Sequence, residues 1–258
     1  MKRIWIAIVS ACSTFSVFPT PRISWDRVTL SGTLAALPLV GALIGGVGLL
    51  YHWIAALLGL PMILSAVVLT VLPVLLSGGI HMDGFADTVD ALSSHAEPEK
   101  KRAILKDPHA GAFAVIGVGC YLLLYFGLCA ALPLSWTSVG LLGLTHVLAR
   151  ASGALLGTVV PSAHEGMLKT FHDAANRASA WVLGAWIALA LLGAAVLSPL
   201  AAGTFAAAGA GVFFYVKHTA NRQFCGMSGD LAGYCITLSE LLMLLGLVLS
   251  ERMATLWF

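Results

Sequence analysis

The sequence has few charged residues for its length. Only 10% of its 258 residues are Asp, Glu, Lys or Arg, and 59% are hydrophobic, whereas soluble globular domains carry about 25% charged and about 45–50% apolar residues. A water-soluble monomer of this composition would expose mostly hydrocarbon, so that class of protein is excluded. The formal net charge of +2 is too small to indicate binding to nucleic acid.

Cysteine motifs and alternating strands are missing too. The five cysteines form no CxxC pair and no Cys/His cluster, so we expect neither a disulfide framework nor a zinc site. The apolar runs do not alternate with polar residues, which argues against a membrane β-barrel. The basic start and the apolar run to Phe18 lack a clear small-residue cleavage site, so we interpret this segment as retained.

What the sequence has instead is long uncharged runs. A membrane-spanning helix needs about 20 mostly apolar residues, and seven stretches reach or approach that length: 33–58, 61–77, 111–132, 138–160, 179–198, 200–216 and 231–250. We therefore expect an all-α, polytopic membrane bundle of about seven spans that forms one domain over residues 1–258. Segment 4–18 is expected to lie in the membrane interface or to tuck into the fold as a helix.

The connections between these stretches are of two kinds. Three are short, uncharged and contain proline, at 59–61, 132–136 and 198–200, and the others hold nearly all the Lys and Arg residues. The positive-inside rule then predicts that the charged connections face the cytoplasm. Gly41 and Gly45 form a GxxxG pair, which favours close helix packing.

An acidic motif follows the second stretch, in the run 79–90. Asp83, Asp87 and Asp90 fall within about 60° of arc on a helix of about 3.6 residues per turn. Like charges on one helix face repel, and carboxylate oxygens suit Mg²⁺ or Mn²⁺ with substrate phosphates as further ligands. The motif therefore predicts a metal site, with a solvated acidic face as the alternative. His81 is a nearby candidate for a base, a ligand or a positioning residue.

The other candidates each have two explanations. Lys106 and Asp107 end a basic run that could bind a polyphosphate or could only mark the cytoplasmic side. Arg150 and Glu240 lie inside apolar stretches, where an ionisable residue predicts either a functional site or a pair that neutralises itself within the bundle. Asp230 starts the last stretch, where an acid could ligate a metal or favour the helix terminus.

Together these motifs resemble the membrane cobalamin synthases, the adenosylcobinamide-GDP ribazoletransferases. The run 79–90, Gly-Ile-His-Met-Asp-Gly-Phe-Ala-Asp-Thr-Val-Asp, is similar to the signature of that family. The similarity covers nearly the whole chain, and its motifs in order are Pro38-Leu39-Val40-Gly41, Ile104-Leu105-Lys106-Asp107 with Gly111 and Phe113, Ala149-Arg150, Ser228-Gly229-Asp230 and Ser239-Glu240-Leu241.

The resemblance implies a phosphotransferase that uses Mg²⁺, with Mn²⁺ as the alternative ion. A ribose hydroxyl of α-ribazole, or of its 5′-phosphate, would attack the cobinamide-linked phosphorus of adenosylcobinamide-GDP. GMP would leave, and adenosylcobalamin or its 5′-phosphate would form. We expect these two substrates and the lipid bilayer as partners and no nucleic acid, and the sequence leaves self-association into a homo-oligomer open.

The resemblance and the residue types together give the expected roles. The expected catalytic residues are His81, Asp83 and Asp87, of which His81 or one Asp would take the proton of the attacking hydroxyl. The expected metal ligands are Asp83, Asp87, Asp90 and Asp230. The residues expected to bind substrate are Lys106, Asp107, Arg150, Arg222 and Glu240.

The two alternative functions are a phosphotransferase of the CDP-alcohol type and a cation-coupled transporter. A CDP-alcohol phosphotransferase motif would need Asp where Ile80 stands and Ala-Arg where Asp87-Thr88 stands. A cation-coupled transporter would place its acidic groups near the middle of the bilayer and would show a repeat of spans. The acidic motif lies at the end of a span and the sequence shows no such repeat, so both alternatives fit less well.

Overall fold

A computed structural model describes residues 2–24, 27–163 and 165–257 of the chain. These residues form helices and loops and no β-strand. The helices, in chain order, are α1 (Lys2–Phe15), α2 (Arg27–Leu58), α3 (Met62–Leu76), α4 (Ile80–Ser93), α5 (Pro98–Ile104), α6 (Ala112–Ala131), α7 (Trp136–Val159), α8 (Met167–Ala174), α9 (Arg177–Leu197), α10 (Pro199–Gln223) and α11 (Gly229–Trp257).

Six of these helices are long and apolar enough to cross a membrane: α2, α6, α7, α9, α10 and α11. The remaining predicted stretch, 61–77, forms only the 15-residue helix α3. It qualifies as a span only together with α4, and the two helices meet at a 90° bend. The expected membrane bundle of about seven spans is therefore confirmed as six full spans and one bent pair.

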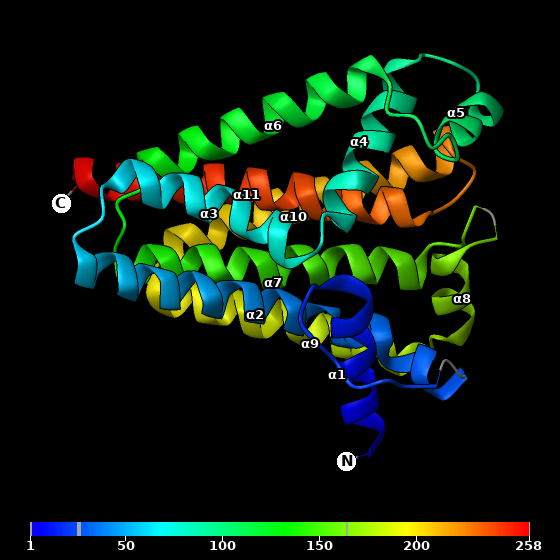
Figure 1. Cartoon of the computed structure of the whole chain (residues 1–258), viewed down its shortest axis with the longest axis horizontal. Helices are drawn as coiled ribbons and strands as arrows, with labels where there is room; N and C mark the ends of the chain where they lie inside the picture. The colour runs from blue at the N-terminus through cyan, green and yellow to red at the C-terminus, as the bar shows by residue number, and fades with distance from the viewer. Residues whose placement is uncertain (1, 25–26, 164, 258) are drawn as a thin grey trace.

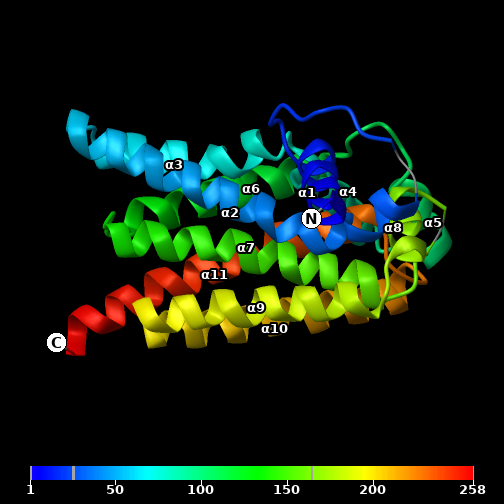
Figure 2. The ribbon, with the colours of Figure 1, turned by 90° about the horizontal axis from the view of Figure 1, so that it is seen from below.

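The two ends of the bundle differ in chemistry. The three proline-containing connections join α2 to α3, α6 to α7 and α9 to α10 at one end, as predicted. The short helices α5 and α8, which carry many of the loop charges, lie at the opposite end (Figures 1 and 2). We call this opposite end the charged end.

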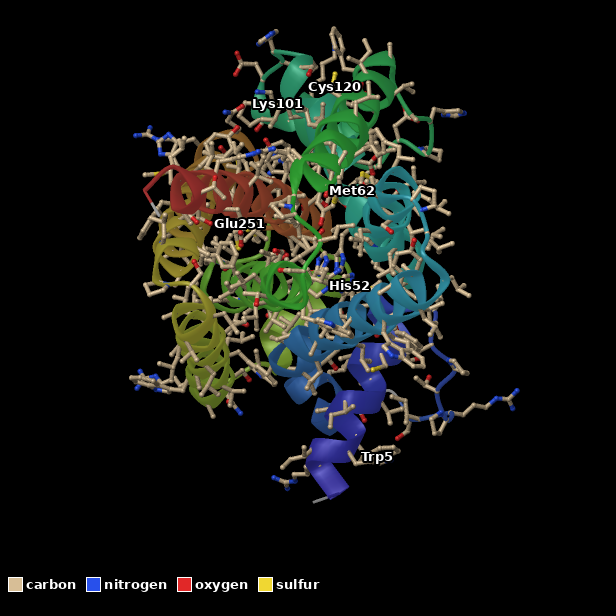
Figure 3. All side chains as sticks on the ribbon, turned by 90° about the vertical axis from the view of Figure 1, so that its left-hand side faces the viewer. Trp5, His52, Met62, Lys101, Cys120 and Glu251 are labelled. Carbon is tan, nitrogen blue, oxygen red and sulfur yellow. The ribbon has the colours of Figure 1, made fainter. Side chains whose placement is uncertain are left out.

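Helix α7 forms the centre of the bundle and the outer helices face outward with apolar side chains. Most of α7 is buried, whereas Leu123 of α6, Trp181 of α9 and Val196 of α9 are 72%, 80% and 79% exposed. Figure 3 looks along the bundle and shows side chains radiating from its outer helices. A surface of this kind is stable against lipid and not against water.

Glycines allow α2 to lie directly on α7. A Cβ at Gly41 would come within 2.6 Å of the carbonyl carbon of His146, and a Cβ at Gly45 within 2.8 Å of the Cα of Gly143. Only glycine leaves room for backbones this close. The close packing predicted from the GxxxG pair is confirmed.

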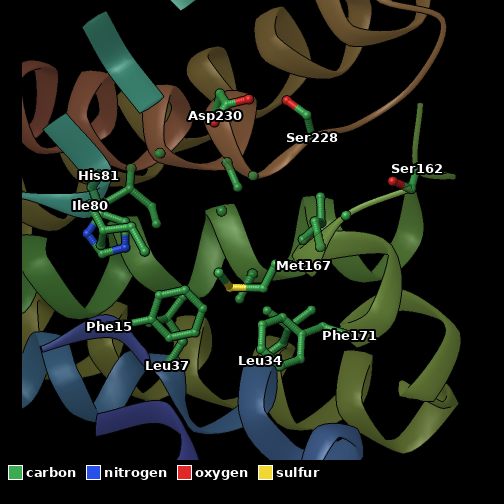
Figure 4. A pocket seen from close by; sticks show the side chains of 18 of the residues that line it. Phe15, Leu34, Leu37, Ile80, His81, Ser162, Met167, Phe171, Ser228 and Asp230 are labelled. Atoms are coloured by element: carbon green, nitrogen blue, oxygen red, sulfur yellow. The ribbon is translucent and has the colours of Figure 1, made fainter. Parts of the chain in front are cut away.

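Helix α1 crosses the bundle near its charged end (Figure 1). It is anchored to α2 by a buried hydrogen bond of 2.6 Å between the hydroxyls of Ser10 and Thr33. The prediction of a short helix in segment 4–18 is therefore confirmed as far as Phe15; its second half packs on α2, whereas Ile4 and Trp5 are exposed, and the choice between an interfacial and a tucked helix stays a prediction. The last residue of α1, Phe15, points into the hollow described below (Figure 4).

Candidate functional site

The acidic stripe lies on α4, which two glycines turn across the charged end. Gly78 and Gly79 connect α3 to α4 with φ values of +64° and +78°, a left-handed conformation that glycine adopts without strain. Phe85 then holds α4 in place, because its ring stacks on Tyr234 of α11 at 5.5 Å and packs against Tyr121 of α6 at 5.4 Å. The predicted helix and its one-sided stripe of Asp83, Asp87 and Asp90 follow from this placement.

Asp230 reaches the same region from the first turn of α11. The loop before α11 is tied to the loop after α7 by two backbone hydrogen bonds of 2.8 Å, from Ala163 N–H to the Met227 carbonyl and from Met227 N–H to the Pro161 carbonyl. Ser228 then caps α11, accepting the N–H of Leu231 at 3.2 Å. Asp230 falls in the first turn of α11, where a helix dipole favours an acid.

Two further glycines bring α4 and α11 together. A Cβ at Gly84 would lie 2.8 Å from both the Cα and the carbonyl oxygen of Asp230, and a Cβ at Gly233 would lie 2.9 Å from the carbonyl oxygen of His81. Thr237 adds a hydrogen bond of 3.2 Å to that same His81 carbonyl. The close contact of the two helices therefore sets Asp230 beside the α4 stripe.

The four carboxylates interact with one another. Asp87 is half-buried on α4, and the negative charges of Asp83, Asp230 and Asp90 all act on its carboxylate. Four carboxyl groups held this close repel one another, and a cation among them would relieve that repulsion.

The described residues fit the predicted metal site only in part. Among the described residues, no three His, Cys, Asp or Glu side chains converge closely enough to hold an ion by themselves. Asp90 lies against Gly111 at the start of α6, where a Cβ would collide with its carboxylate. The donor chemistry still suits Mg²⁺, which commonly takes one or two carboxylates and completes its shell with substrate phosphates and water. Metal ligation stays a prediction.

His81 is buried without a partner. Its side chain is 7% exposed, and neither ring nitrogen has a hydrogen-bond partner among the described residues. A neutral imidazole ring has one nitrogen that donates a hydrogen bond and one that accepts, so two partners are missing here. Its ring lies nearly parallel to that of Phe15, with 6.1 Å between the centroids.

Two hollows open beside Asp83. The more enclosed one has a volume of about 410 Å³ and is lined from six helices (α1, α2, α4, α7, α8 and α11) and their loops, by His81, Asp83 and Asp230 among others. Figure 4 shows Ser228 and Asp230 on the side of this hollow opposite the rings of Phe15 and Phe171. We call it the inner hollow.

The second hollow is more open, has a volume of about 570 Å³, and is lined by Val74, Gly78, Gly79, Ile80, Met82, Asp83, Ala86 and Val118. We call it the outer hollow. Asp83 and Ile80 line both hollows. The side chain of Asp83 therefore stands at the boundary between two spaces that could hold two different molecules.

Arg150 and Glu240 pair with each other inside the bundle. They are 1% and 5% exposed, and Arg150 Nη1 donates to Glu240 Oε1 at 2.5 Å while His146 Nδ1 lies 2.8 Å from the same oxygen. Both residues lie outside the lining of the two hollows. The structure therefore shows the pair that the sequence offered as one explanation, and substrate binding by either residue stays a prediction.

The remaining predicted substrate-binding residues lie in loops and helix ends at the charged end. Lys106 and Arg222 are exposed. Asp107 is also exposed, but its carboxylate accepts the backbone N–H of His109 at 2.9 Å and lies 2.8 Å from His109 Nδ1, and these hydrogen bonds lower its pKa. Asp107 therefore stabilises its own turn, and a role for it in substrate binding stays a prediction.

Sequence reasoning missed most of the inner hollow. Phe15 and Phe171 form its aromatic side, with 6.1 Å between their ring centroids. Lys169 also lines it and pairs with Glu165 at 2.8 Å and Asp173 at 3.5 Å. The aromatic residues carry no local signal that separates them from core residues, whereas the ionic i, i+4 spacing around Lys169 was visible in the sequence.

Gly84→Ala is expected to impair the site more than the fold. The new Cβ would meet the backbone of Asp230 at 2.8 Å, so α4 must shift away from α11 and displace the carboxylates. Misplacement on this scale commonly lowers the rate by about 10- to 100-fold. The measurement is kcat for the reaction proposed below, with Gly119→Ala on α6 as the control, because nothing lies within 4 Å of its new Cβ. Equal activity of both variants would contradict the prediction.

The chain is similar to one family of known proteins over nearly its whole length. The profile of the family described as cobalamin-5-phosphate synthase matches residues 7–248. Proteins named adenosylcobinamide-GDP ribazoletransferase are 36% identical in Lachnoclostridium phytofermentans (97% of this chain and 95% of that protein) and 34% identical in Desulfitobacterium hafniense (95% and 96%). One from Clostridium perfringens is 29% identical (96% and 100%). No solved structure matches the chain.

Proposed function

The chain belongs to the cobalamin-5-phosphate synthase family, and we propose that its charged end joins adenosylcobinamide phosphate to a ribazole acceptor. The protein is a transferase of late cobalamin biosynthesis, an adenosylcobinamide-GDP ribazoletransferase. Its apolar helices make it a multi-pass membrane protein.

The reaction is a phosphoryl substitution. A ribose hydroxyl of α-ribazole, or of its 5′-phosphate, forms a bond to the cobinamide-linked phosphorus of adenosylcobinamide-GDP. The bond from that phosphorus to the oxygen bridging the two phosphates breaks, and GMP leaves with this oxygen. The hydroxyl proton passes to a carboxylate or to water. Such a transfer needs positioning and neutralisation of charge more than covalent chemistry from the protein.

The position of Asp83 carries this proposal. It lines both hollows, so an acceptor in one and a donor phosphate at the other would meet beside its carboxylate. A carboxylate there can orient the attacking hydroxyl and accept its proton. His81, whose ring nitrogens have no partner among the described residues, would hydrogen-bond the acceptor.

The acidic residues also suit a Mg²⁺ ion, with Mn²⁺ as the alternative. Asp83 and Asp230 line the inner hollow together and would hold the ion with substrate phosphates, and Asp87 and Asp90 add negative charge beside them. When bound, the ion neutralises phosphate oxygens and eases departure of GMP. The exposed cations Lys106 and Arg222 would contact phosphate from the loops.

We further place the charged end in the cytoplasm of a bacterial or archaeal cell, across the inner membrane. The clustering of Lys and Arg in the connections at this end supports that orientation. The nucleotide donor would then reach the site from the side where nucleotides are made.

Release of GMP by the detergent-purified protein tests the proposal. We expect GMP only when adenosylcobinamide-GDP, α-ribazole and Mg²⁺ are all present, and none with EDTA. Parallel reactions with Mn²⁺ and with α-ribazole 5′-phosphate define the ion and the acceptor. GMP release that ignores the acceptor, or no release from folded protein in restored lipid, would overturn the transferase mechanism. Activity with a CDP-lipid donor would favour the phosphatidyltransferase alternative.

A further inference from the structure

The inner hollow has one apolar side and one polar side. Its apolar side comes from five helices, α1, α2, α7, α8 and α11, and it consists of Phe15, Leu34, Leu37, Ala154, Phe171 and Ile236. Across from the two aromatic rings lie Ser228 and Asp230 (Figure 4). A pocket of this kind suits a ligand with a flat apolar part and a hydroxylated part.

His81 provides an independent sign of a ligand. It is more than nine-tenths buried and lines the hollow, and both of its ring nitrogens lack partners among the described residues. A buried polar group without a hydrogen bond costs free energy, and native proteins usually satisfy such groups. A bound molecule that offers one acceptor and one donor would satisfy both nitrogens of the neutral ring.

Size and polarity separate the candidate ligands. A volume of about 410 Å³ is at the lower end of the range for small-molecule pockets, about 300–1,000 Å³, so it suits a nucleoside and excludes a whole corrinoid. Guanine carries several donors and acceptors on its edges, and the apolar side of this hollow would leave many of them unpaired. The base of ribazole, by contrast, is a dimethylated benzimidazole, which has a flat apolar face and a single free ring nitrogen that accepts a hydrogen bond.

We propose that the inner hollow is the acceptor site, and that it holds the benzimidazole base of ribazole against Phe15, Phe171 and His81. The ribose then faces the oxygens of Ser228, Asp83 and Asp230. This inference rests on the proposed function for the identity of the acceptor. It leaves the corrinoid nucleotide to the outer hollow and the loops of the charged end, on the other side of Asp83.

Lys169 gives the acceptor site a second feature. Lys169 belongs to the lining of the hollow, and its ammonium group is held by the carboxylates of Glu165 and Asp173. A 5′-phosphate on the ribose would compete with these carboxylates for the same ammonium group. The site therefore accommodates the nucleoside and offers its phosphate a cation at the edge.

Filling the hollow tests the inference by binding alone. Ala232 of α11 lines the hollow and is half-buried, so Ala232→Phe would occupy the space of the base. The matched control is Ala210→Phe, in a separate apolar groove of about 280 Å³ between α7, α9 and α10. Equilibrium dialysis of radiolabelled α-ribazole against the purified full-length protein, without donor, should show at least a tenfold weaker Kd for Ala232→Phe and less than a twofold change for Ala210→Phe.

A milder variant keeps the test valid if Ala232→Phe does not fold. Phe15→Leu keeps an apolar side chain but removes the ring, and it should weaken α-ribazole binding threefold or more. Unchanged α-ribazole affinity in folded Ala232→Phe, or in Phe15→Leu if Ala232→Phe does not fold, would overturn the inference. So would a variant that loses affinity for GMP while keeping affinity for α-ribazole. Wild-type protein that binds α-ribazole in this hollow but releases no GMP would contradict the proposed function and leave the binding site standing.

Discussion

Asp83→Asn is expected to lower kcat for GMP release by about 10²–10³-fold while the protein still inserts and folds. The substitution keeps the size of the side chain and removes its charge at the boundary between the two hollows. Loss of one preorganised charge at a reacting phosphate commonly costs this much in rate. Folding should not suffer, because Asp83 is exposed and its charge opposes that of Asp87.

The control for this variant is Glu99→Gln, which should leave kcat unchanged. Glu99 is another exposed carboxylate at the charged end, and among the described residues it pairs only with Arg102 on its own helix, at 3.2 Å. Single-turnover GMP release, together with the thermal midpoint of each purified variant, separates chemistry from folding. Asp87→Asn should also lower kcat. Folded Asp83→Asn that turns over at the wild-type rate would remove Asp83 from the mechanism, and unfolding of both Asp83→Asn and Asp87→Asn would assign the stripe to structure.

The parts of the fold that the sequence predicts are those fixed by local periodicity. The apolar stretches, the proline turns and the helix that carries Asp83, Asp87 and Asp90 each depend on residues within one or two helical turns. The bend before α4 was not predicted, although Gly78 and Gly79 occupy it with positive φ. Adjacent glycines permit such a bend without requiring it.

The parts that could not be predicted depend on contacts between distant residues. Phe15 and Phe171 become one aromatic side of a hollow only after α1 and α8 dock on the bundle, and in the sequence they are two apolar residues among many. Lys101 looks like part of a basic loop, yet it is buried and donates to Gln223 at 2.6 Å across 122 residues. Residue type indicates which groups are unusual, and tertiary packing decides which of them meet.

Glu240→Leu is expected to be the most destabilising single substitution among the ionisable residues. It leaves the guanidinium of Arg150 buried without its carboxylate, and it also removes the partner of His146. Breaking a buried ion pair from one side typically costs about 3–5 kcal/mol, which corresponds to a fall in thermal midpoint on the order of 10 °C for a domain of this size. Thermal unfolding of the detergent-purified variant, followed by loss of the monodisperse peak, measures the effect.

A double variant distinguishes a structural pair from a substrate-binding one. Arg150→Met combined with Glu240→Leu replaces both charges with apolar side chains, so it should recover much of the lost stability; His146 still lacks its acceptor, which keeps the recovery incomplete. Glu99→Gln, which breaks the exposed pair with Arg102 at 3.2 Å, should cost no more than about 1 kcal/mol. If Glu240→Leu were as stable as wild type but bound adenosylcobinamide-GDP more weakly, the predicted role of Arg150 and Glu240 in substrate binding would be supported. Because both side chains are buried in the described structure and lie outside both hollows, we expect the loss to appear in stability.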